Sequence, residues 1–562
     1  MSNSQVLDPP EIESPFEIRR SAEKTGRRPR RPHAEQMWAA LIFTISLLYL
    51  FLFRRYSAMD LDEGIVLQGA ERILHGQVPY RDFFMFYTPG SVYIVAMLFK
   101  VFGDSLNVAR AGIAISGSGC TVVTYLLSRR VCSRNIALVA AGLSITNSVA
   151  YRFLVLHNWF ATSFACLTIY AVVRLWESEK PAWALATGSL AALTTLIEQS
   201  KGAGLCLGLA IGYLILRIFA RKDFLRRSHI TLLAVGFLLP WFLTFLYFGW
   251  KHSIVSMLQD WLWPLHHYAK SNRVFYGYQN WPEGARDKIF YTGAIWVRIV
   301  KYVAISPGFI VPFLPLAAVA WLVYETIRAG NMRSSSCSSD YYILVSAASS
   351  GLLLSILMVR ADITHFMYLA PTWYVVLAWI LGSRDLRSPV LHKMRPFLIV
   401  YVCIAFGLMN FALVLGVNGA RNHSHTRRGI VVTSQNDTVI DYVQAHVAAG
   451  DNLLVYPYLP LYNYLTETLS PAPLDFFQAG MNTPQQAQEI INSLKSDKPR
   501  AVLFEPGFAE KVASTWPNTP LTAVVADPVA DFIVRNYRIC AALTTTSDSR
   551  FQFMVREGES CD

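Results

Sequence analysis

Residues 37–53 read MWAALIFTISLLYLFLF, a run without a single charged side chain. A helix of this kind crosses the hydrocarbon core of a membrane, because it satisfies all its own backbone polar groups. The whole chain agrees with this interpretation: 53% of its 562 residues are hydrophobic and only 16% are charged, against roughly a quarter charged in soluble domains. The sequence therefore predicts a polytopic α-helical membrane protein.

Further apolar runs predict additional spans and an orientation. They lie at about 108–127, 136–154, 158–176, 182–199, 202–219, 230–250, 308–328, 341–358, 365–381 and 396–416, which gives about eleven transmembrane helices. The polar arm 1–36 ends in a cluster of arginines, and the connections 128–135, 220–229 and 383–396 are also rich in Arg and Lys. Because basic residues beside spans stay in the cytoplasm, we expect a cytoplasmic N-terminus in a multi-pass plasma (inner) membrane protein.

The basic arm also admits binding to nucleic acid or anionic lipid, but the topogenic interpretation explains it more simply, and no nucleic-acid partner is expected. The spans and their loops define a transmembrane domain over residues 37–416, whose first outer loop covers 54–106. Within that loop, Glu63–His75 carries apolar and polar residues on opposite faces and predicts a helix lying along the membrane interface. Ser91–Phe102 predicts a second helix of this kind.

Residues 417–562 are more polar and alternate between helix and strand patterns. Helices are predicted from Asp437 to Ala449 and from Thr483 to Lys495, with strands at Leu453–Tyr456 and Ala501–Phe504. This alternation predicts a small α/β domain, and the odd number of spans places it outside the cytoplasm. Cys540 and Cys561 fall in this domain, where a disulfide between them is an open possibility. No Gly-rich phosphate-binding motif supports nucleotide binding.

An acidic triplet follows the first predicted span. Asp60, Asp62 and Glu63 precede the interfacial helix, and the sequence HGQVPYRDF follows it. Either aspartate suits a helix N-cap. For Asp60 we favour a cap or a solvated charge, whereas for Asp62 we favour a functional role over a cap.

The stretch 59–103, MDLDEGIVLQGAERILHGQVPYRDFFMFYTPGSVYIVAMLFKVFG, resembles the first extracytosolic loop of the GT-C membrane glycosyltransferases. It is most similar to the branch of protein O-mannosyltransferases and aminoarabinose transferases, including bacterial relatives that build cell-envelope glycans. The matching residues are Asp62, Glu63, Gly76, Pro79, Tyr80, Arg81, Asp82 and Arg110. The resemblance implies a GT-C fold with Asp62 as the catalytic carboxylate, and Glu63, Tyr80, Arg81, Asp82 and Arg110 as further site residues. Arg110 is also a candidate partner for an acidic residue of this loop.

Three further polar groups lie at predicted outer ends of spans. The sequence RADITH places Arg360, Asp362 and His365 together in a short loop, which favours phosphate binding over a local ion pair. Lys201 is either a phosphate ligand or a lysine that snorkels to the interface. His157 either lines a pocket or belongs to a helix cap.

Sugar transfer to a hydroxyl needs a base at the acceptor and cations at the departing phosphate. We therefore predict an inverting glycosyltransferase that moves sugar from a polyprenyl-phosphate carrier to a lipid, glycan or protein acceptor at the outer membrane face. No dedicated metal site and no required cofactor are expected, although a divalent cation shared by Glu63 or Asp82 and the substrate phosphate stays open. The alternatives are a transporter or flippase, a non-catalytic assembly protein for lipid-linked glycans, and a polymerase or ligase with a diphosphate-linked donor.

Overall fold

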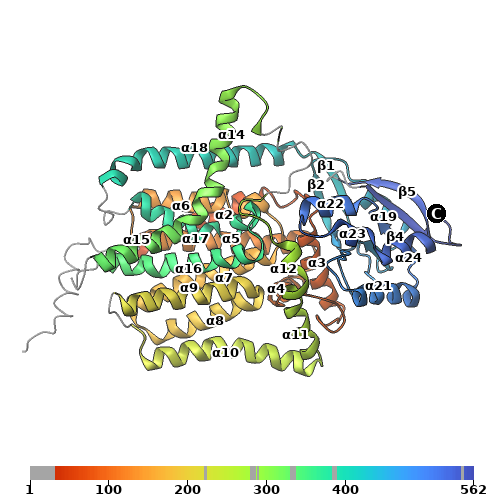
Figure 1. Ribbon diagram of the computed structural model, residues 1–562, viewed down its shortest axis with the longest axis horizontal. Helices are drawn as coiled ribbons and strands as arrows, with labels where there is room; N and C mark the ends of the chain where they lie inside the picture. Colours follow the sequence, from red (N-terminus) through yellow and green to blue (C-terminus); the bar gives the residue numbers. More distant parts are fainter. Residues whose placement is uncertain are drawn as a thin grey trace, which may run out of the picture.

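The computed structural model describes residues 32–219, 224–278, 287, 290–328, 337–382, 389–545 and 550–561. A bundle of long helices forms one end of the molecule, and a mixed α/β domain covers the other end (Figure 1). Most of the predicted arm 1–36 lies outside the described residues, as do parts of the loops 220–229, 329–340 and 383–396.

Each of the eleven predicted spans contains a helix. The helices are α2 (Pro32–Phe51), α5 (Leu106–Ser128), α6 (Arg134–Thr146), α7 (His157–Ser178), α8 (Pro181–Ile197), α9 (Gln199–Ile218), α10 (Arg227–Trp250), α15 (Leu314–Arg328), α16 (Cys337–Val359), α17 (Ile363–Gly382) and α18 (Pro389–Gly419). Among the described residues, nine helical stretches are long and apolar enough to cross a membrane. The predicted polytopic helical architecture is confirmed, while α6 and α8, with 13 and 17 residues, are shorter than such a stretch.

Two boundaries differ from the prediction. The span expected at 136–154 is wrong in its second half, because α6 ends at Thr146 and a short 3-10 helix covers Val149–Arg152. Before α15, the additional helix α14 (Ile295–Ile310) stands at a steep angle to the bundle in Figure 1. Pro307 lies in the last turn of α14, and Pro312 lies in the short 3-10 turn that follows it. Because a proline has no amide hydrogen to donate, the two prolines interrupt the helical hydrogen bonds between α14 and α15.

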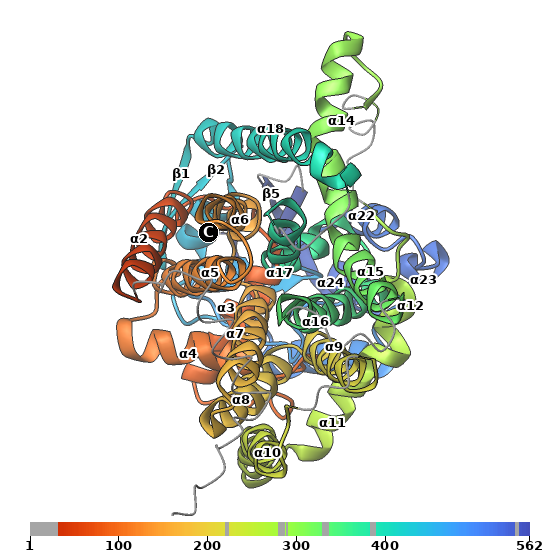
Figure 2. The ribbon, with the colours of Figure 1, turned by 90° about the vertical axis from the view of Figure 1, so that its left-hand side faces the viewer.

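Small residues hold the central helices close together. Gly204, Gly208 and Gly212 recur every four residues along α9 and face Ala347 and Gly351 of α16. A Cβ atom on Gly204 or Gly208 would collide with backbone atoms of α16, so only glycine permits this crossing. In the end-on view of Figure 2, α17 lies near the centre of the bundle, and 15 of its residues are buried.

The first outer loop folds between the bundle and the α/β domain. It contains α3 (Leu61–Leu74) and α4 (Gly90–Phe102), so both predicted helices are confirmed. The polar face of α3 contacts the C-terminal domain, where Arg72 binds Asp475 at 2.7 Å and Glu71 binds Arg428. The α/β domain covers that face and supplies the missing partners. Gly64 of α3 directly faces the backbone of Leu461, where a Cβ atom would not fit.

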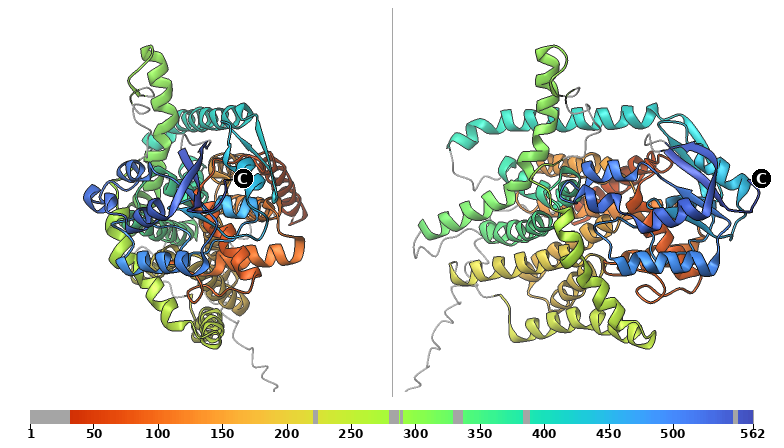
Figure 3. Two further views of the ribbon diagram at one scale, coloured as in Figure 1. Left: turned by 90° about the vertical axis from the view of Figure 1, so that its right-hand side faces the viewer. Right: turned by 45° about the vertical axis from the view of Figure 1, so that its right-hand side comes forward.

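A second connection reaches the same end of the bundle. It contains α11 (Ile254–Trp263), a π-helical turn at Pro264–Tyr268 and α12 (Ala269–Asn272). The right-hand view of Figure 3 shows α11 and α12 running across the bundle beside the α/β domain.

The C-terminal domain begins with a hairpin of β1 (Asn422–Thr426) and β2 (Gly429–Thr433). A four-stranded sheet of β3 (Leu453–Tyr456), β4 (Ala501–Phe504), β5 (Tyr537–Thr544) and β6 (Arg550–Arg556) follows, in the order β3-β4-β6-β5. Its helices are α19 (Val439–His446), α20 (Leu461–Thr466), α21 (Pro484–Asp497), α22 (Phe508–Thr515), α23 (Leu521–Val525) and α24 (Pro528–Asn536). Strands β3 and β4 have the predicted bounds, and they pair in parallel.

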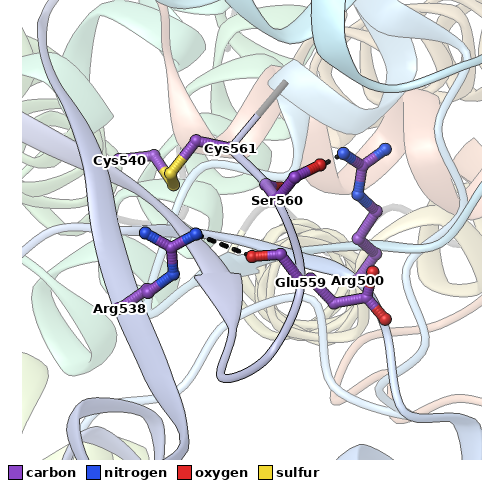
Figure 4. Close-up of a disulfide and its surroundings, with 6 residues drawn as sticks. All are labelled: Arg500, Arg538, Cys540, Glu559, Ser560 and Cys561. Carbon is purple, nitrogen blue, oxygen red and sulfur yellow. Dashed lines mark hydrogen bonds between the residues drawn. A yellow bond between two sulfur atoms is a disulfide. The ribbon is translucent and has the colours of Figure 1, made fainter.

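Cys540 of β5 and Cys561 form a disulfide, so the pairing that the sequence left open is made (Figure 4). The terminal segment is also held by two side chains of the sheet region. Arg538 donates to the carbonyl of Glu559 at 2.7 Å, and Arg500 donates to that of Ser560 at 3.2 Å. The disulfide therefore closes a loop around β6 that the hydrogen bonds already order.

Replacing Cys540 with serine is expected to lower the unfolding free energy of the C-terminal domain by about 3 kcal/mol, because the bridged residues are 21 positions apart. Thermal unfolding of the full chain under oxidising conditions measures this change. Cys403→Ser removes an exposed free thiol and is the matched control. Equal melting temperatures for all three proteins, with no response of the wild type to reductant, would contradict the prediction.

Candidate active site

A cavity of about 850 Å³ lies where the bundle meets the C-terminal domain. Its walls come from the start of α3, the segment 151–158, the start of α9, the connection between α16 and α17, and the loops after β3 and β4. Charged residues and histidines from all these parts line it: Asp60, Asp62, Arg152, His157, Glu198, Lys201, Arg360, Asp362, His365, Glu505 and Lys511. The cavity thus collects polar groups that are hundreds of residues apart in the sequence.

A fully buried ion pair beneath the cavity fixes the first outer loop. Arg110 of α5 binds both carboxylate oxygens of Glu63, at 2.9 and 2.6 Å, and both side chains are 0% exposed. Arg110 also donates to the carbonyls of Arg54 and Tyr56, and Glu63 accepts the amide hydrogen of Val155 at 3.0 Å. Four segments therefore meet at one pair of side chains, which is why burial of these charges is tolerated.

Asp60 and Asp62 share one cation in the cavity. Asp60 caps α3 by accepting the amide hydrogen of Asp62 at 3.0 Å, and it also pairs with Arg152. Arg152 lies 3.2 Å from Asp62 and donates to the Tyr368 hydroxyl at 2.5 Å. Burial raises the pKa of Asp60, and the charge of Asp62 adds to the rise against the opposing effect of Arg152. The side chain of Asp62 is 38% exposed and faces the cavity as the more accessible carboxylate.

Lys201 lies at the start of α9 and is almost completely buried. Its ammonium group donates to Asn158 and to Glu198, the latter at 2.5 Å. It also lies 5.5 Å from the centroid of the Tyr368 ring. A lysine that snorkels to the lipid interface would be exposed at its tip, so this alternative is wrong.

Arg360, Asp362 and His365 form a connected cluster. Arg360 binds Asp362 at 2.6 Å, and the same carboxylate accepts hydrogen bonds from the backbone and ring of His365 at 2.8 and 2.6 Å. Burial would raise the pKa of Asp362, but His365 and Arg360 outweigh it and hold the pKa well below its usual range.

The remaining donors of Arg360 extend the cluster to other parts of the chain. They reach the side-chain oxygen of Asn272 at 2.9 Å and the carbonyl of Thr515 at 2.8 Å. The local ion pair of the sequence analysis therefore exists, and it also ties the bundle to the C-terminal domain.

The C-terminal domain contributes to the cavity wall through the residues that follow the carboxyl ends of its two parallel strands. Tyr458 follows β3, and Glu505 follows β4; both line the cavity. Glu505 pairs with Lys511 of α22, which lines the cavity as well. Ligands of α/β proteins characteristically bind at the carboxyl ends of parallel strands, so this edge of the sheet is suited to contact a substrate.

Comparisons with known proteins agree with this architecture. Residues 87–248 match the family model described as dolichyl-phosphate-mannose-protein mannosyltransferase. The structure is similar to ArnT from Cupriavidus metallidurans bound to undecaprenyl phosphate, with a TM-score of 0.53, 12% identity, and coverage of 92% of this chain and 98% of ArnT. The chain has the GT-C fold.

A second GT-C structure, the oligosaccharyltransferase of Archaeoglobus fulgidus, matches with a TM-score of 0.50 and 11% identity, covering 86% of this chain and 72% of the other. A search of curated protein sequences finds no match. The match to the family model and the similarity to ArnT confirm the resemblance that the first outer loop indicated.

Within the GT-C fold, six of the eleven predicted site residues line the cavity. They are Asp62, His157, Lys201, Arg360, Asp362 and His365. Their proposed roles in catalysis and binding stay predictions, but their convergence from separate loops is a property of the structure.

The other five predicted site residues do not line the cavity. Glu63 and Arg110 are engaged with each other beneath it, which confirms the expected pairing and leaves no surface for a substrate. Tyr80 donates to the carbonyl of Tyr87 and accepts from Trp261. Arg81 and Asp82 pair with each other on the surface. Each of these five has a polar partner within the protein, and their direct contact with substrate stays a prediction.

Arg152 is the main cavity residue that the sequence analysis missed. It was included in the predicted span 136–154 and received no role. An arginine near the end of an apolar run is a functional candidate by default, and that signal was available. Asp60 was assigned only a capping or solvated role, yet it both caps α3 and holds Arg152. The sequence around Glu505 and Lys511 contains no motif that indicates a functional site, because only the tertiary fold brings these residues to the cavity.

The sequence analysis named two carboxylates, Glu63 and Asp82, that could share a divalent cation with the substrate phosphate. Both have hydrogen-bond partners within the protein. Glu63 is held by Arg110, and Asp82 accepts from Arg81 and from the amide of Val78. In the part of the chain that the structure describes, no group of three or more His, Cys, Asp or Glu residues has an arrangement suited to a metal.

Replacing Arg110 with methionine is expected to cost about 3–5 kcal/mol of stability, because it leaves the Glu63 carboxylate buried without a cation. Thermal unfolding of the purified chain in lipid measures the loss, and the double variant Arg110→Met/Glu63→Gln is expected to recover part of it. Arg81→Met, which breaks an exposed pair, is the control. A melting temperature for Arg110→Met within error of this control would show that the buried pair does not anchor the loop.

Proposed function

We propose that this protein is an inverting glycosyltransferase that takes a sugar from a polyprenyl-phosphate carrier and transfers it to an acceptor hydroxyl. The observation that carries the proposal is the position of Asp62: it is an accessible carboxylate in a large cavity of a GT-C fold, and Lys201 and Arg360 line the same cavity. Base and cations thus share one space, as the reaction requires.

In this reaction Asp62 accepts the proton of the acceptor hydroxyl as its oxygen attacks the anomeric carbon. The bond from that carbon to the phosphate oxygen breaks, and its electron pair leaves with the carrier phosphate. A single displacement inverts the anomeric centre. Arg152 orients Asp62 through their contact at 3.2 Å, and its second carboxylate partner, Asp60, keeps the arginine in place.

The similar proteins and the membrane-spanning helices support this donor class. The matching family model is described as dolichyl-phosphate-mannose-protein mannosyltransferase, and the similar ArnT structure is bound to undecaprenyl phosphate. Both names support a polyprenyl-phosphate carrier for this chain. We place the cavity at the outer face of the plasma membrane, with a lipid, glycan or protein hydroxyl as the acceptor.

Asp62→Asn is expected to lower the turnover of purified protein in lipid by roughly 100-fold or more, because the amide cannot accept the proton. The assay follows release of free polyprenyl phosphate from a panel of radiolabelled polyprenyl-phosphate sugars. Asp441→Asn changes an exposed carboxylate of α19 outside the cavity and is expected to retain activity.

Wild-type turnover by folded Asp62→Asn protein would refute Asp62 as the base. Vectorial movement of intact donor across the membrane without sugar release would instead identify a transporter. Folded wild-type protein that binds the donor and does neither would indicate an assembly protein, and release of a diphosphate carrier would identify a polymerase or ligase.

We further propose that the reaction needs no dedicated metal, because Arg152, Lys201 and Arg360 supply positive charge around the cavity. Turnover is therefore expected to be unchanged after treatment with EDTA. Loss of activity that added Mg²⁺ or Mn²⁺ restores would assign a divalent cation to the site.

A further inference from the structure

His365 is a titratable side chain of the cavity that the proposed reaction leaves without a role. It lies in the first turn of α17 and lines the cavity, and its side chain is 27% exposed. The side chains of Lys201, Arg360 and Asp362 are at most 10% exposed. Among these neighbouring polar groups, His365 is therefore the one that a bound substrate can reach most easily.

Two contacts with Asp362 fix the orientation of the ring. One carboxylate oxygen of Asp362 accepts from the backbone amide and from Nδ1 of His365, at 2.8 and 2.6 Å. An ionised carboxylate can only accept hydrogen bonds, so Nδ1 carries a hydrogen. The ring of Tyr368 lies edge-on to the imidazole, with centroids 5.6 Å apart. The neutral ring thus has one defined tautomer, with its lone pair on Nε2.

The second nitrogen, Nε2, is open. Within the described part of the chain it has no hydrogen-bond partner, and it is not one of the fully buried polar atoms without a partner. Because the ring is part of the cavity wall, the accessible surface of Nε2 is available to a substrate held there. An imidazole that is held by a carboxylate at Nδ1 and is open at Nε2 is the arrangement with which histidine transfers protons in Ser-His-Asp triads.

Asp362 also places the ring beside a cation. Arg360 and His365 bind the two oxygens of this one carboxylate, so a phosphate attracted to Arg360 lies next to the imidazole. The proposed base, Asp62, belongs to another wall of the cavity, at the start of α3, and is held by Arg152. Inverting sugar-transfer sites have an acid at the leaving group and a base on the opposite face of the sugar. The two walls are suited to these two positions.

Charged and titratable groups from three elements surround His365. They are Arg360, Asp362 and Tyr368 beside it, His157 at the start of α7, and Glu198 and Lys201 at the start of α9. Lys201 and Arg360 are each paired with a carboxylate, so their charges are compensated. Asp362 is the charged group in direct contact with the ring, and it stabilises the protonated form.

We propose that His365 is the general acid for the departing carrier. The protonated ring donates its Nε2 hydrogen to the phosphate oxygen as the bond from that oxygen to the anomeric carbon breaks. The electron pair of this bond stays on the oxygen and takes the proton, so the carrier leaves as a monoanion and the imidazole becomes neutral. Asp62 holds the acceptor proton, and exchange with water restores both groups. Asp362 is a positioning residue. This role rests on the proposed function.

The test is the pH dependence of kcat and KM for release of free polyprenyl phosphate by the full chain in lipid. Because imidazoles ordinarily lose their charge between about pH 5 and 8, wild-type kcat is expected to decline on the alkaline side. His365→Gln is expected to lower kcat about 100-fold and to abolish this decline. Free imidazole added to His365→Ala is expected to restore part of the rate. Asp362→Asn keeps the imidazole and is expected to lower kcat while retaining the decline.

His423→Gln is the matched control, because it changes an exposed histidine of β1 outside the cavity. A His365→Gln protein with a raised KM for the donor but with wild-type kcat and pH dependence would overturn the proposal and leave phosphate binding as its only role. A wild-type kcat without an alkaline decline would overturn it as well. If wild type releases carrier from no donor, the proposed function fails and this role fails with it, whereas release with an unchanged His365→Gln profile refutes this role alone.

Discussion

The buried pair of Arg110 and Glu63 organises the whole site. It joins the segment after α2, the start of α3, the first turns of α5 and the segment before α7 at one point. Asp62 is the direct neighbour of Glu63, and Arg152 lies three residues before Val155. Fixing one pair therefore fixes the distance between the proposed base and the arginine that orients it. A buried ion pair of this kind adds little to stability by itself, but breaking it is costly, so it defines one arrangement of the loop.

Charge compensation is the second principle of the cavity. Each lysine and arginine that lines it is paired with a carboxylate. The C-terminal domain completes this balance through Thr515, Glu505 and Lys511, so it forms part of the site in addition to covering it.

The sequence predicted the architecture well because long apolar runs and helix–strand alternation are local signals. The bounds of β3 and β4 were correct for this reason, as was the location of Asp62 beside a helix start. Prediction failed where distant parts of the chain decide the environment. The polar face of α3 is covered by the C-terminal domain, and Arg152 lies beyond a helix that ends early. Glu63 and Arg110 resembled site residues by motif, yet burial gives them a structural position.

A cryo-EM structure of the chain in lipid with a non-transferable polyprenyl-phosphate sugar tests this account most directly. The account predicts that the sugar lies in the cavity with its anomeric carbon facing Asp62, and that its phosphate lies in the same cavity. The buried pair of Arg110 and Glu63 should be unchanged in that complex. A carrier bound between helices near the membrane midplane, with the cavity empty and Asp62 still held by Arg152, would contradict it and favour a transporter.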